Sequence, residues 1–288
     1  MAQQQQRNRT WFITGASSGF GLAFARHALG RGDRVVATAR RTERLAGLAA
    51  EFPDQVLLQP LDVTQPAQAR AAVVAAVARF GGIDVVLNNA GYGIVGGVEE
   101  TPDDELRAQM EANFFGAVNV IRAALPQLRA QRSGAIVNMS SMGGQLSFGG
   151  FSAYSASKFA LEGLSEALAQ EMAPFGVKVL IVEPGAFRTG FAGDALKHMP
   201  VLDAYADVTG GIREFAHGMD GTQAGDPAKA ASAVVAALDA ENTPLRLQLG
   251  ADAVDAVRGH AQQMLDDMAR WEAVARATGF DEAAVQAA

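Results

Sequence analysis

The sequence of 288 residues contains no cysteine. This absence excludes disulfides, thiolate metal sites and cysteine nucleophiles, and it fits a reducing compartment. Histidine is also scarce, and its four copies are scattered along the chain, at His27, His198, His217 and His260. Such scattered positions give no support to a metal centre or to the Ser-His-Asp set of a hydrolase, so we expect no metal.

The chain has no uncharged apolar run approaching about 18 residues, the length that spans a membrane. Its first nine residues are polar and lack the apolar core of a secretory signal. Basic residues are outnumbered, 24 against 31 acidic residues, which gives a net charge of −7. A surface of this sign repels nucleic acid and anionic membranes. We therefore expect a cytoplasmic protein that binds neither nucleic acid nor membrane.

Short apolar runs alternate with segments of helical spacing throughout the chain. The runs predict seven buried strands, at residues 10–14, 34–39, 55–61, 83–88, 135–140, 177–183 and 245–249. The helical segments are residues 20–30, 43–51, 66–79, 102–130, 153–172, 228–241 and 251–278. Strands that alternate with helices predict an α/β protein with a parallel sheet and helices on both faces.

No repeat, low-complexity linker or change of composition divides the chain, so we expect one domain over residues 10–288, after a flexible tail of residues 1–9. Residues 188–225 interrupt the alternation, because they hold several glycines and no clear strand. A connection of this length in a compact domain is usually a lid or a binding segment. We predict a substrate lid around residues 187–225, with a disordered surface loop as the alternative.

The first predicted strand leads into a turn with glycines at positions 15, 19 and 21. Glycine permits a tight turn and a close approach of backbone amides to a pyrophosphate, which then faces the free N–H groups of the next helix. The spacing Gly-x-x-x-Gly-x-Gly differs from the commoner Gly-x-Gly-x-x-Gly, and a flexible turn is the alternative. Its place after the first strand favours dinucleotide binding. The predicted contacts are Gly15, Ser17, Ser18, Phe20 and Gly21.

The second predicted strand ends at Ala39 and is followed by Arg40 and Arg41. An acidic residue near this place would bind a ribose 2′-hydroxyl. Arginine instead favours a 2′-phosphate, because the guanidinium group matches phosphate in geometry and charge. We therefore predict NADP(H) as the cofactor and Arg40 as a contact. Two solvated arginines at a helix start are the alternative.

Tyr154 and Lys158 are four residues apart in a predicted helix, so they share one face. A neighbouring ammonium group favours phenolate and lowers the pKa of tyrosine from ~10 toward neutrality. A tyrosine of this kind can act as general acid or base on a ketone or alcohol. Ser141, residues 88–91 and residues 184–185 end or follow predicted strands, where open α/β sheets bind ligands.

These motifs, in this order and at this spacing, resemble the short-chain dehydrogenase/reductase family over about residues 10–190. The resemblance implies a single-domain Rossmann fold, doubly wound around a seven-stranded parallel sheet. It also implies that Tyr154 gives or takes the proton, and that Lys158 binds the nicotinamide ribose and tunes Tyr154. Ser141 would hydrogen-bond the substrate oxygen, and Asn113, within a predicted helix, would hold a water of the proton relay.

The same resemblance implies more cofactor contacts, namely Asp62, Val63, Asn89, Gly91, Pro184, Gly185, Phe187 and Thr189. Ser140 neighbours Ser141, but the spacing to Tyr154 favours Ser141. Structural roles stay open for Asn113 as a helix-interior amide and for Asp62 as a cap. The helical segments 102–130 and 153–172 resemble those of family interfaces, which implies a homodimer or homotetramer.

We expect an NADPH-dependent carbonyl reductase that also runs in reverse as an alcohol dehydrogenase. A catalytically idle NADP-binding sensor or scaffold is the alternative, although the intact catalytic set argues against it. The glycine spacing and the limited C-terminal segment favour the shorter branch of the family over nucleotide-sugar epimerases. Apolar residues in 187–225, without a basic cluster, predict a bulky apolar ketone or secondary alcohol as substrate. Their packing into a satellite core is the alternative.

Overall fold

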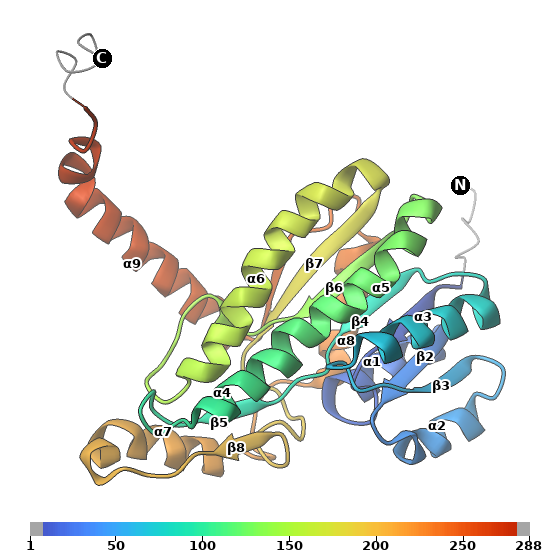
Figure 1. The fold of residues 1–288 in the computed structure, drawn as a ribbon, viewed down its shortest axis with the longest axis horizontal. Helices are drawn as coiled ribbons and strands as arrows, with labels where there is room; N and C mark the ends of the chain where they lie inside the picture. Colours follow the sequence, from blue (N-terminus) through green and yellow to red (C-terminus); the bar gives the residue numbers. More distant parts are fainter. Residues whose placement is uncertain (1–7, 281–288) are drawn as a thin grey trace.

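The computed structural model describes residues 8–280, and a seven-stranded parallel sheet forms its centre (Figure 1). The strand order is β3-β2-β1-β4-β6-β7-β9. From β1 the chain winds outward through β2 and β3, and it then returns to wind the other way through β4, β6, β7 and β9. The bounds are β1 (Thr10–Ile13), β2 (Arg34–Ala39), β3 (Val56–Pro60), β4 (Val85–Asn88), β6 (Gly134–Met139), β7 (Val177–Pro184) and β9 (Arg246–Leu249). The predicted doubly wound sheet of seven parallel strands is confirmed.

Helices cover both faces of the sheet, as predicted. One face packs against α1 (Gly19–Gly30), α2 (Ala46–Glu51) and α8 (Pro227–Asp239). The other face packs against α3 (Pro66–Phe80), α5 (Gly116–Gln131) and α6 (Ser152–Met172). Small side chains at helical spacing form the inward stripes, as in α3 with Ala69, Ala72, Val73 and Ala76.

The single helix predicted over residues 102–130 is divided in the structure. It consists of α4 (Asp103–Met110), a π-helical turn η2 (Glu111–Phe115) and α5. A π-turn holds one extra residue and changes the direction of the side chains within it, and such turns often occur at functional sites. Asn113 lies in this turn and is 2% exposed. The subdivision therefore falls at a predicted site residue.

Residues 187–225, in which no strand was predicted, contain β8 (Leu196–His198), the short 3-10 turn η5 (Asp203–Tyr205) and α7 (Ala206–Gly218). The prediction of a strandless segment is wrong. β8 pairs in parallel with β5 (Gly93–Val95), which was also not predicted, because three residues are too few to show a pattern. Gly210 and Gly211, two of the glycines in this segment, lie inside α7.

The two ends of the chain differ in their contacts. α9 (Ala251–Arg276) starts beside β9 and projects away from the body (Figure 1), with exposed Met264, Met268 and Trp271. Of the predicted tail, residues 1–7 lie outside the described residues, whereas the Arg9 N–H donates to Asp33 Oδ1 at 2.9 Å. Among residues 8–280, no helix combines the length and apolarity needed to cross a membrane.

Candidate active site

The predicted site residues meet at one end of the sheet. Gly15 follows β1, Asn89 follows β4, Ser141 follows β6, and Gly185 follows β7. These are the carboxyl ends of parallel strands, and between β1 and β4 the winding direction reverses. Open α/β sheets bind their ligands at such a switch point. The topology therefore brings the predicted residues to the place where a ligand is expected.

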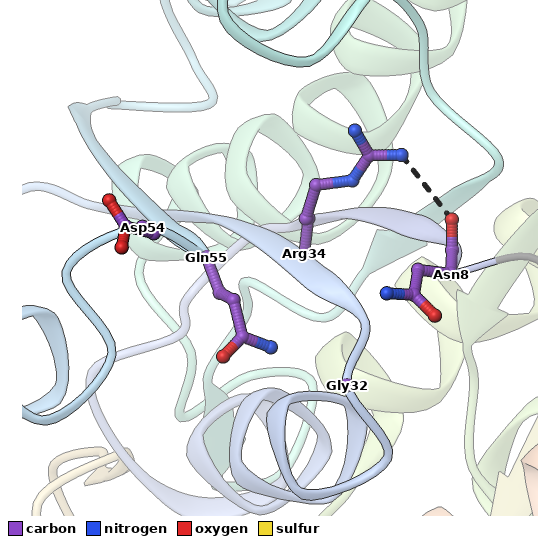
Figure 2. Close-up of a pocket in the computed structure, with 5 residues that line it drawn as sticks. All are labelled: Asn8, Gly32, Arg34, Asp54 and Gln55. Carbon is purple, nitrogen blue, oxygen red and sulfur yellow. Dashed lines mark hydrogen bonds between the residues drawn. The ribbon is translucent and has the colours of Figure 1, made fainter.

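An open hollow of about 570 Å³ lies at the opposite end of the sheet (Figure 2). Arg34 begins β2 and Gln55 precedes β3, so the hollow borders the amino ends of the strands. Its lining is Asn8, Gly32, Arg34, Asp54 and Gln55, and it includes no predicted site residue. Across residues 8–280 no group of three or more histidine, aspartate or glutamate side chains could hold a metal ion. The predicted catalytic residues therefore do not line this hollow.

The glycine turn has the geometry of a close backbone approach. Gly15 has φ +63°, a conformation that residues with a Cβ rarely adopt. A Cβ on Gly21 would collide with the carbonyl oxygen of Gly15, so the start of α1 packs directly on the turn. Asn89 Nδ2 donates to the carbonyls of Thr14 at 3.0 Å and Gly15 at 3.2 Å. The end of β4 thus holds the turn in place.

The start of α1 suits an anion. Its N-cap is Ser18, whose side chain makes no capping hydrogen bond, and the first turn has no acidic residue. The first N–H groups of the helix are therefore available to a phosphate. The Phe20 and Phe187 ring centroids lie 5.2 Å apart, and a Cβ on Gly19 would lie 3.3 Å from Thr189 Cβ. Residues 187–189 are thus brought to the turn, as the cofactor prediction requires.

Further predicted cofactor contacts follow β2 and β3, at the same end of the sheet as this turn. Arg40 is exposed directly after β2. Asp62 Oδ1 accepts hydrogen bonds from Thr64, from N at 3.0 Å and from Oγ1 at 2.8 Å. These bonds close a turn in the loop before α3, whose N-cap is Gln65, so Asp62 does not cap that helix. Its contact with the cofactor stays a prediction. Val63 packs against Gly116 of α5.

Three of the four predicted catalytic residues converge. Lys158 Nζ lies 5.7 Å from the centroid of the Tyr154 ring, one helical turn away in α6. Lys158 Nζ also donates to the Met139 carbonyl, at the end of β6, at 2.7 Å. The Ser141 hydroxyl lies near enough to Tyr154 to lower its pKa, and it accepts from Gly143 N at 3.0 Å and donates to the Pro184 carbonyl at 3.5 Å. The spacing argument for Ser141 agrees with this placement, because Ser140 instead contacts Glu162.

The electrostatics of this group differ from the prediction. Burial raises the pKa of the Tyr154 hydroxyl to about 12, and the neighbouring Ser141 hydroxyl only partly opposes this shift. Burial also lowers the pKa of Lys158 to about 8, against the opposing charge of Glu162. The predicted lowering of the Tyr154 pKa by Lys158 is therefore not found. Desolvation is the largest cause of the shift, and the Lys158 ammonium donates to the Met139 carbonyl instead.

Asn113 lies behind this group and its side chain is fully engaged. Its Nδ2 donates to the Tyr92 carbonyl at 2.9 Å and to Ser157 Oγ at 3.0 Å, while Oδ1 accepts from Tyr92 N at 3.0 Å. The Ser157 hydroxyl in turn donates to the Tyr154 carbonyl at 2.7 Å. Asn113 therefore joins the chain after β4, near Gly91, to the start of α6. Its role in a proton relay stays a prediction.

A buried acidic network adjoins Lys158, and the sequence analysis missed it. Arg246 Nε lies 3.0 Å from Glu162 Oε2 and 3.2 Å from Glu183 Oε1. Gln145 Nε2 donates to both carboxylates at 3.1 Å. Burial raises the pKa of Glu162 to about 7, and it also raises the pKa of Glu183. The spacing of four residues between Lys158 and Glu162 was the available signal.

Two phenylalanines flank Tyr154, with ring centroids at 6.3 Å for Phe151 and 5.5 Å for Phe191. Other apolar residues of the 187–225 segment divide into two groups. Leu196 and Met199 are buried in small clusters, as the satellite-core alternative expects. Val201 and Phe215 are each 58% exposed. The wall of the site at Tyr154 is therefore aromatic.

Comparison with known proteins accounts for this arrangement. A family model described as short chain dehydrogenase matches residues 9–200. The chain belongs to the short-chain dehydrogenase family. Oxidoreductase BOA17 of Botryotinia fuckeliana is 41% identical over 271 residues, which cover 94% of this chain and 99% of that protein. This member of the family is accordingly an oxidoreductase.

Solved structures agree. A short-chain dehydrogenase from Streptomyces avermitilis shares 51% sequence identity and superposes with a TM-score of 0.90, covering 95% of this chain and all of the other. A short-chain dehydrogenase from Burkholderia cenocepacia J2315, solved in complex with NADP, shares 28% identity with a TM-score of 0.71. It covers 91% of this chain and 97% of its own. The Rossmann-like fold predicted for the family is thereby confirmed.

Proposed function

We propose that this short-chain dehydrogenase is an NADPH-dependent reductase of bulky apolar ketones, reversible as an alcohol dehydrogenase. The convergence of Tyr154, Ser141 and Lys158 beside the carboxyl end of β6 carries the proposal. With its pKa raised to about 12, the Tyr154 hydroxyl keeps its proton at neutral pH. A protonated phenol is an acid, which is what the reduction of a carbonyl requires.

The described residues fit a dinucleotide. The open N-terminus of α1 would hold the pyrophosphate, because its N–H groups lack a side-chain cap. Gly21 packs so closely on Gly15 that no side chain can stand between the turn and the start of α1. The exposed Arg40 would contact a 2′-phosphate, and the NADP complex of the Burkholderia relative supports this choice of cofactor.

The side chains have distinct tasks in the proposed reaction. When bound, NADPH would supply the hydride that the carbonyl carbon accepts. Tyr154 donates its phenolic proton to the carbonyl oxygen, so that ketone, hydride and proton together give the secondary alcohol. Ser141 donates a hydrogen bond to the same oxygen and orients it toward Tyr154. The Lys158 ammonium stabilises the phenolate that remains, until a proton from solvent restores the hydroxyl.

The substrate class follows from the wall of the site. Phe151 and Phe191 beside Tyr154 favour an apolar, preferably aromatic, group next to the carbonyl. The proposal includes a cytoplasmic homodimer or homotetramer. Phe115 and Phe159 support an interface, because they are 44% and 46% exposed near α5 and on α6, whereas Val118 is buried.

The test is a kinetic comparison with the full chain. Acetone, acetophenone and 2-acetonaphthone increase in apolar size at constant charge, and each is assayed with NADPH and NADH. We expect kcat/KM to rise with size and to favour NADPH by about tenfold or more, since a charge-assisted contact with phosphate contributes about 1.5–3 kcal/mol. NADPH binding without turnover would instead support the sensor. A preference for phosphorylated or small hydrophilic ketones would overturn the substrate class.

A further inference from the structure

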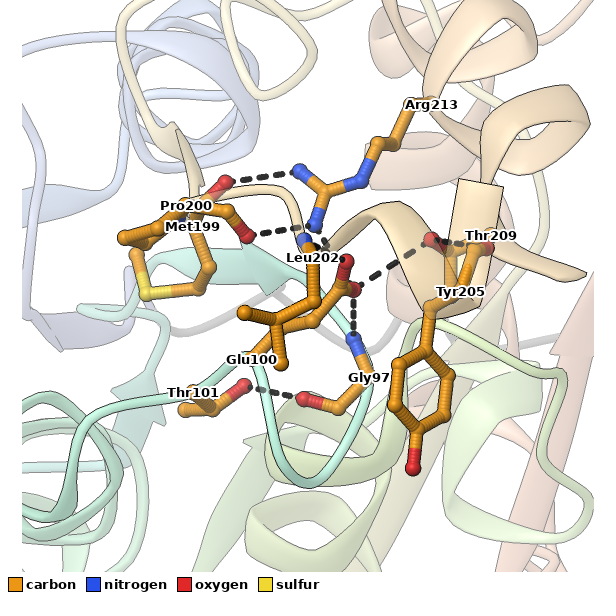
Figure 3. A network of polar contacts seen from close by, with 9 residues as sticks. All are labelled: Gly97, Glu100, Thr101, Met199, Pro200, Leu202, Tyr205, Thr209 and Arg213. Carbon is orange, nitrogen blue, oxygen red and sulfur yellow. Dashed lines mark hydrogen bonds and ion pairs between the residues drawn. The ribbon is translucent and has the colours of Figure 1, made fainter. Parts of the chain in front are cut away.

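A buried ion pair fastens the 187–225 segment to the rest of the chain (Figure 3). Glu100 lies in the turn between β5 and α4, and its side chain is 0% exposed. Glu100 Oε2 accepts from Arg213 Nη2 at 2.8 Å, from Gly97 N at 2.7 Å and from Thr209 Oγ1 at 3.2 Å. Glu100 Oε1 accepts from Leu202 N at 3.1 Å. Three of these four donors belong to the 187–225 segment.

Arg213 extends the same network within the segment. Its side chain is 10% exposed, and it also donates to the carbonyls of Met199 at 2.8 Å and Pro200 at 3.1 Å. It therefore joins α7 to the chain that leaves β8 and fixes both on Glu100. We call Gly97, Glu100, Leu202, Thr209 and Arg213 the Glu100–Arg213 clamp.

The fastened segment forms part of the wall at Tyr154. Its residue Phe191 lies 5.5 Å from the Tyr154 ring, and β8 pairs with β5 directly before the turn that holds Glu100. Ile212, next to Arg213, packs with Phe151 and Phe191 on the buried cluster of Val95, Leu196 and Ala216. A movement of α7 would therefore be transmitted to both phenylalanines beside Tyr154.

A buried ion pair contributes to geometry more reliably than to stability. The desolvation of two charges offsets most of their attraction, and an apolar replacement of both is often as stable. The requirement for several correctly placed donors nevertheless selects one arrangement of the groups involved. A pair of this kind, placed where a segment meets the body, is thus suited to hold that segment in one position.

We infer that Glu100 and Arg213 are positioning residues, which set the shape of the pocket for bulky apolar ketones by holding Phe191 and Ile212 against the catalytic helix. The inference rests on the proposed function, since it concerns the substrate of the same site. Neither residue touches the reacting atoms. Their loss should weaken the binding of large substrates more than that of small ones, because a small ketone needs less of the wall.

The experiment compares the full-length wild type with Arg213→Met and Glu100→Gln, and with the control Lys197→Met. Lys197 joins the same segment to Glu105 through an ion pair that is 50% and 30% exposed, so it matches the connection without the burial. We expect KM for 2-acetonaphthone to rise about tenfold or more in the first two variants and KM for acetone to change little. Hydrogen exchange of residues 191–219, measured with NADPH present, should accelerate in both. Lys197→Met should match the wild type in every measurement.

A double variant separates positioning from the effect of an unpaired charge. Glu100→Gln with Arg213→Met removes both charges, so it should recover thermal stability relative to Arg213→Met while KM for 2-acetonaphthone stays raised. Recovery of KM together with stability would overturn the inference. The inference would also fail if the single variants showed the hydrogen exchange and the KM values of the control. It would fail too if they lost affinity for both ketones and for NADPH to the same extent.

Two further arrangements keep the test decisive. If Arg213→Met fails to fold, Arg213→Lys and Thr209→Val remove individual donors. Their KM for 2-acetonaphthone should rise by less than tenfold, and again by more than their KM for acetone. Unchanged KM in both would then reject the clamp. If the wild type reduces no ketone, the proposed function fails, whereas hydrogen exchange of residues 191–219 still reports whether the clamp holds the segment.

Discussion

Two buried carboxyl groups, Glu100 at the 187–225 segment and Glu162 on α6, differ in the direction in which their surroundings shift the pKa. Burial raises the pKa of Glu100. Hydrogen bonds from Gly97, Leu202 and Arg213 lower it by more than burial raises it, so the pKa is about 2. Burial also raises the pKa of Glu162, and there the single Arg246 is shared with Glu183, so the result is about 7. Glu100 has four hydrogen-bond donors, whereas Glu162 shares its arginine with a second carboxyl, and hydrogen bonds to the charged form favour a charged carboxyl.

The clamp around Glu100 and the network around Glu162 should therefore respond differently to pH. The clamp around Glu100 keeps its charge over the whole physiological range, so the 187–225 segment should be held alike at any neutral pH. The network around Glu162 changes its proton content near neutrality, one helical turn from Lys158. Chemistry on α6 should therefore respond to pH, whereas the fastening of the segment should not.

The strongest test of this division is Tyr154→Phe, which removes one hydroxyl on the α6 side. We expect kcat to fall by about two to four orders of magnitude, the contribution of a positioned general acid. KM for 2-acetonaphthone should stay within a small factor, because the aromatic wall is intact. Steady-state kinetics of the purified variant, with its fold checked by circular dichroism, give the answer. A near-normal kcat would remove Tyr154 from the mechanism.

The choice of cofactor depends neither on the Glu100–Arg213 clamp nor on the catalytic residues of α6, so it should change independently of them. Ala39→Asp with Arg40→Ala places a carboxylate at the end of β2 and removes the exposed guanidinium. We expect the preference for NADPH to reverse, a change of about tenfold or more in the ratio of kcat/KM values. KM for 2-acetonaphthone at saturating cofactor serves as the control. Equal use of both cofactors by the wild type would contradict the role of Arg40.

The smallest expected effect concerns stability against pH. The folded-state pKa of Glu162, about 7, lies above its ordinary value of 4.5, so its contribution to stability is fully present below 4.5 and is lost as pH rises through 7. Glu162→Gln stays neutral and should reduce the loss between pH 5 and 8 by about 1 kcal/mol. Urea unfolding across this range measures the free energies. Identical slopes for both proteins would show that Glu162 does not titrate there.

Glu100 supplies the mirror case for the same measurement. Its folded-state pKa, about 2, lies below the ordinary 4.5, so its contribution is present above 4.5 and is lost as pH falls toward 2. Glu100→Gln should lose the dependence between pH 4.5 and 2 and keep that between pH 5 and 8. If the pH dependence of the unfolding free energy of Glu100→Gln changed between pH 5 and 8 instead, the assignment of the acid range to Glu100 would be wrong.

The sequence predicted the parts of the molecule that repeat a local pattern. Runs of four to eight apolar residues became the strands of the central sheet, and the motif at Tyr154 and Lys158 placed them on one face of α6. β5 and β8 were not predicted because each has only three residues, too few to show a pattern. The pKa of Tyr154 was predicted in the wrong direction, since spacing shows a neighbouring charge but not the loss of hydration. Glu100 and Arg213 carry no pattern that joins them.

The 113 positions that separate Glu100 from Arg213 also bear on how the molecule folds. Two strands of the central sheet, β6 and β7, and the whole of α6 lie between these residues, and contacts of such long separation carry a large cost of loop closure. We expect the 187–225 segment to dock last and to open first, as a local unit of low stability. A newly made chain would then complete its dinucleotide turn before its substrate wall, and so acquire affinity for the cofactor ahead of any selectivity among ketones.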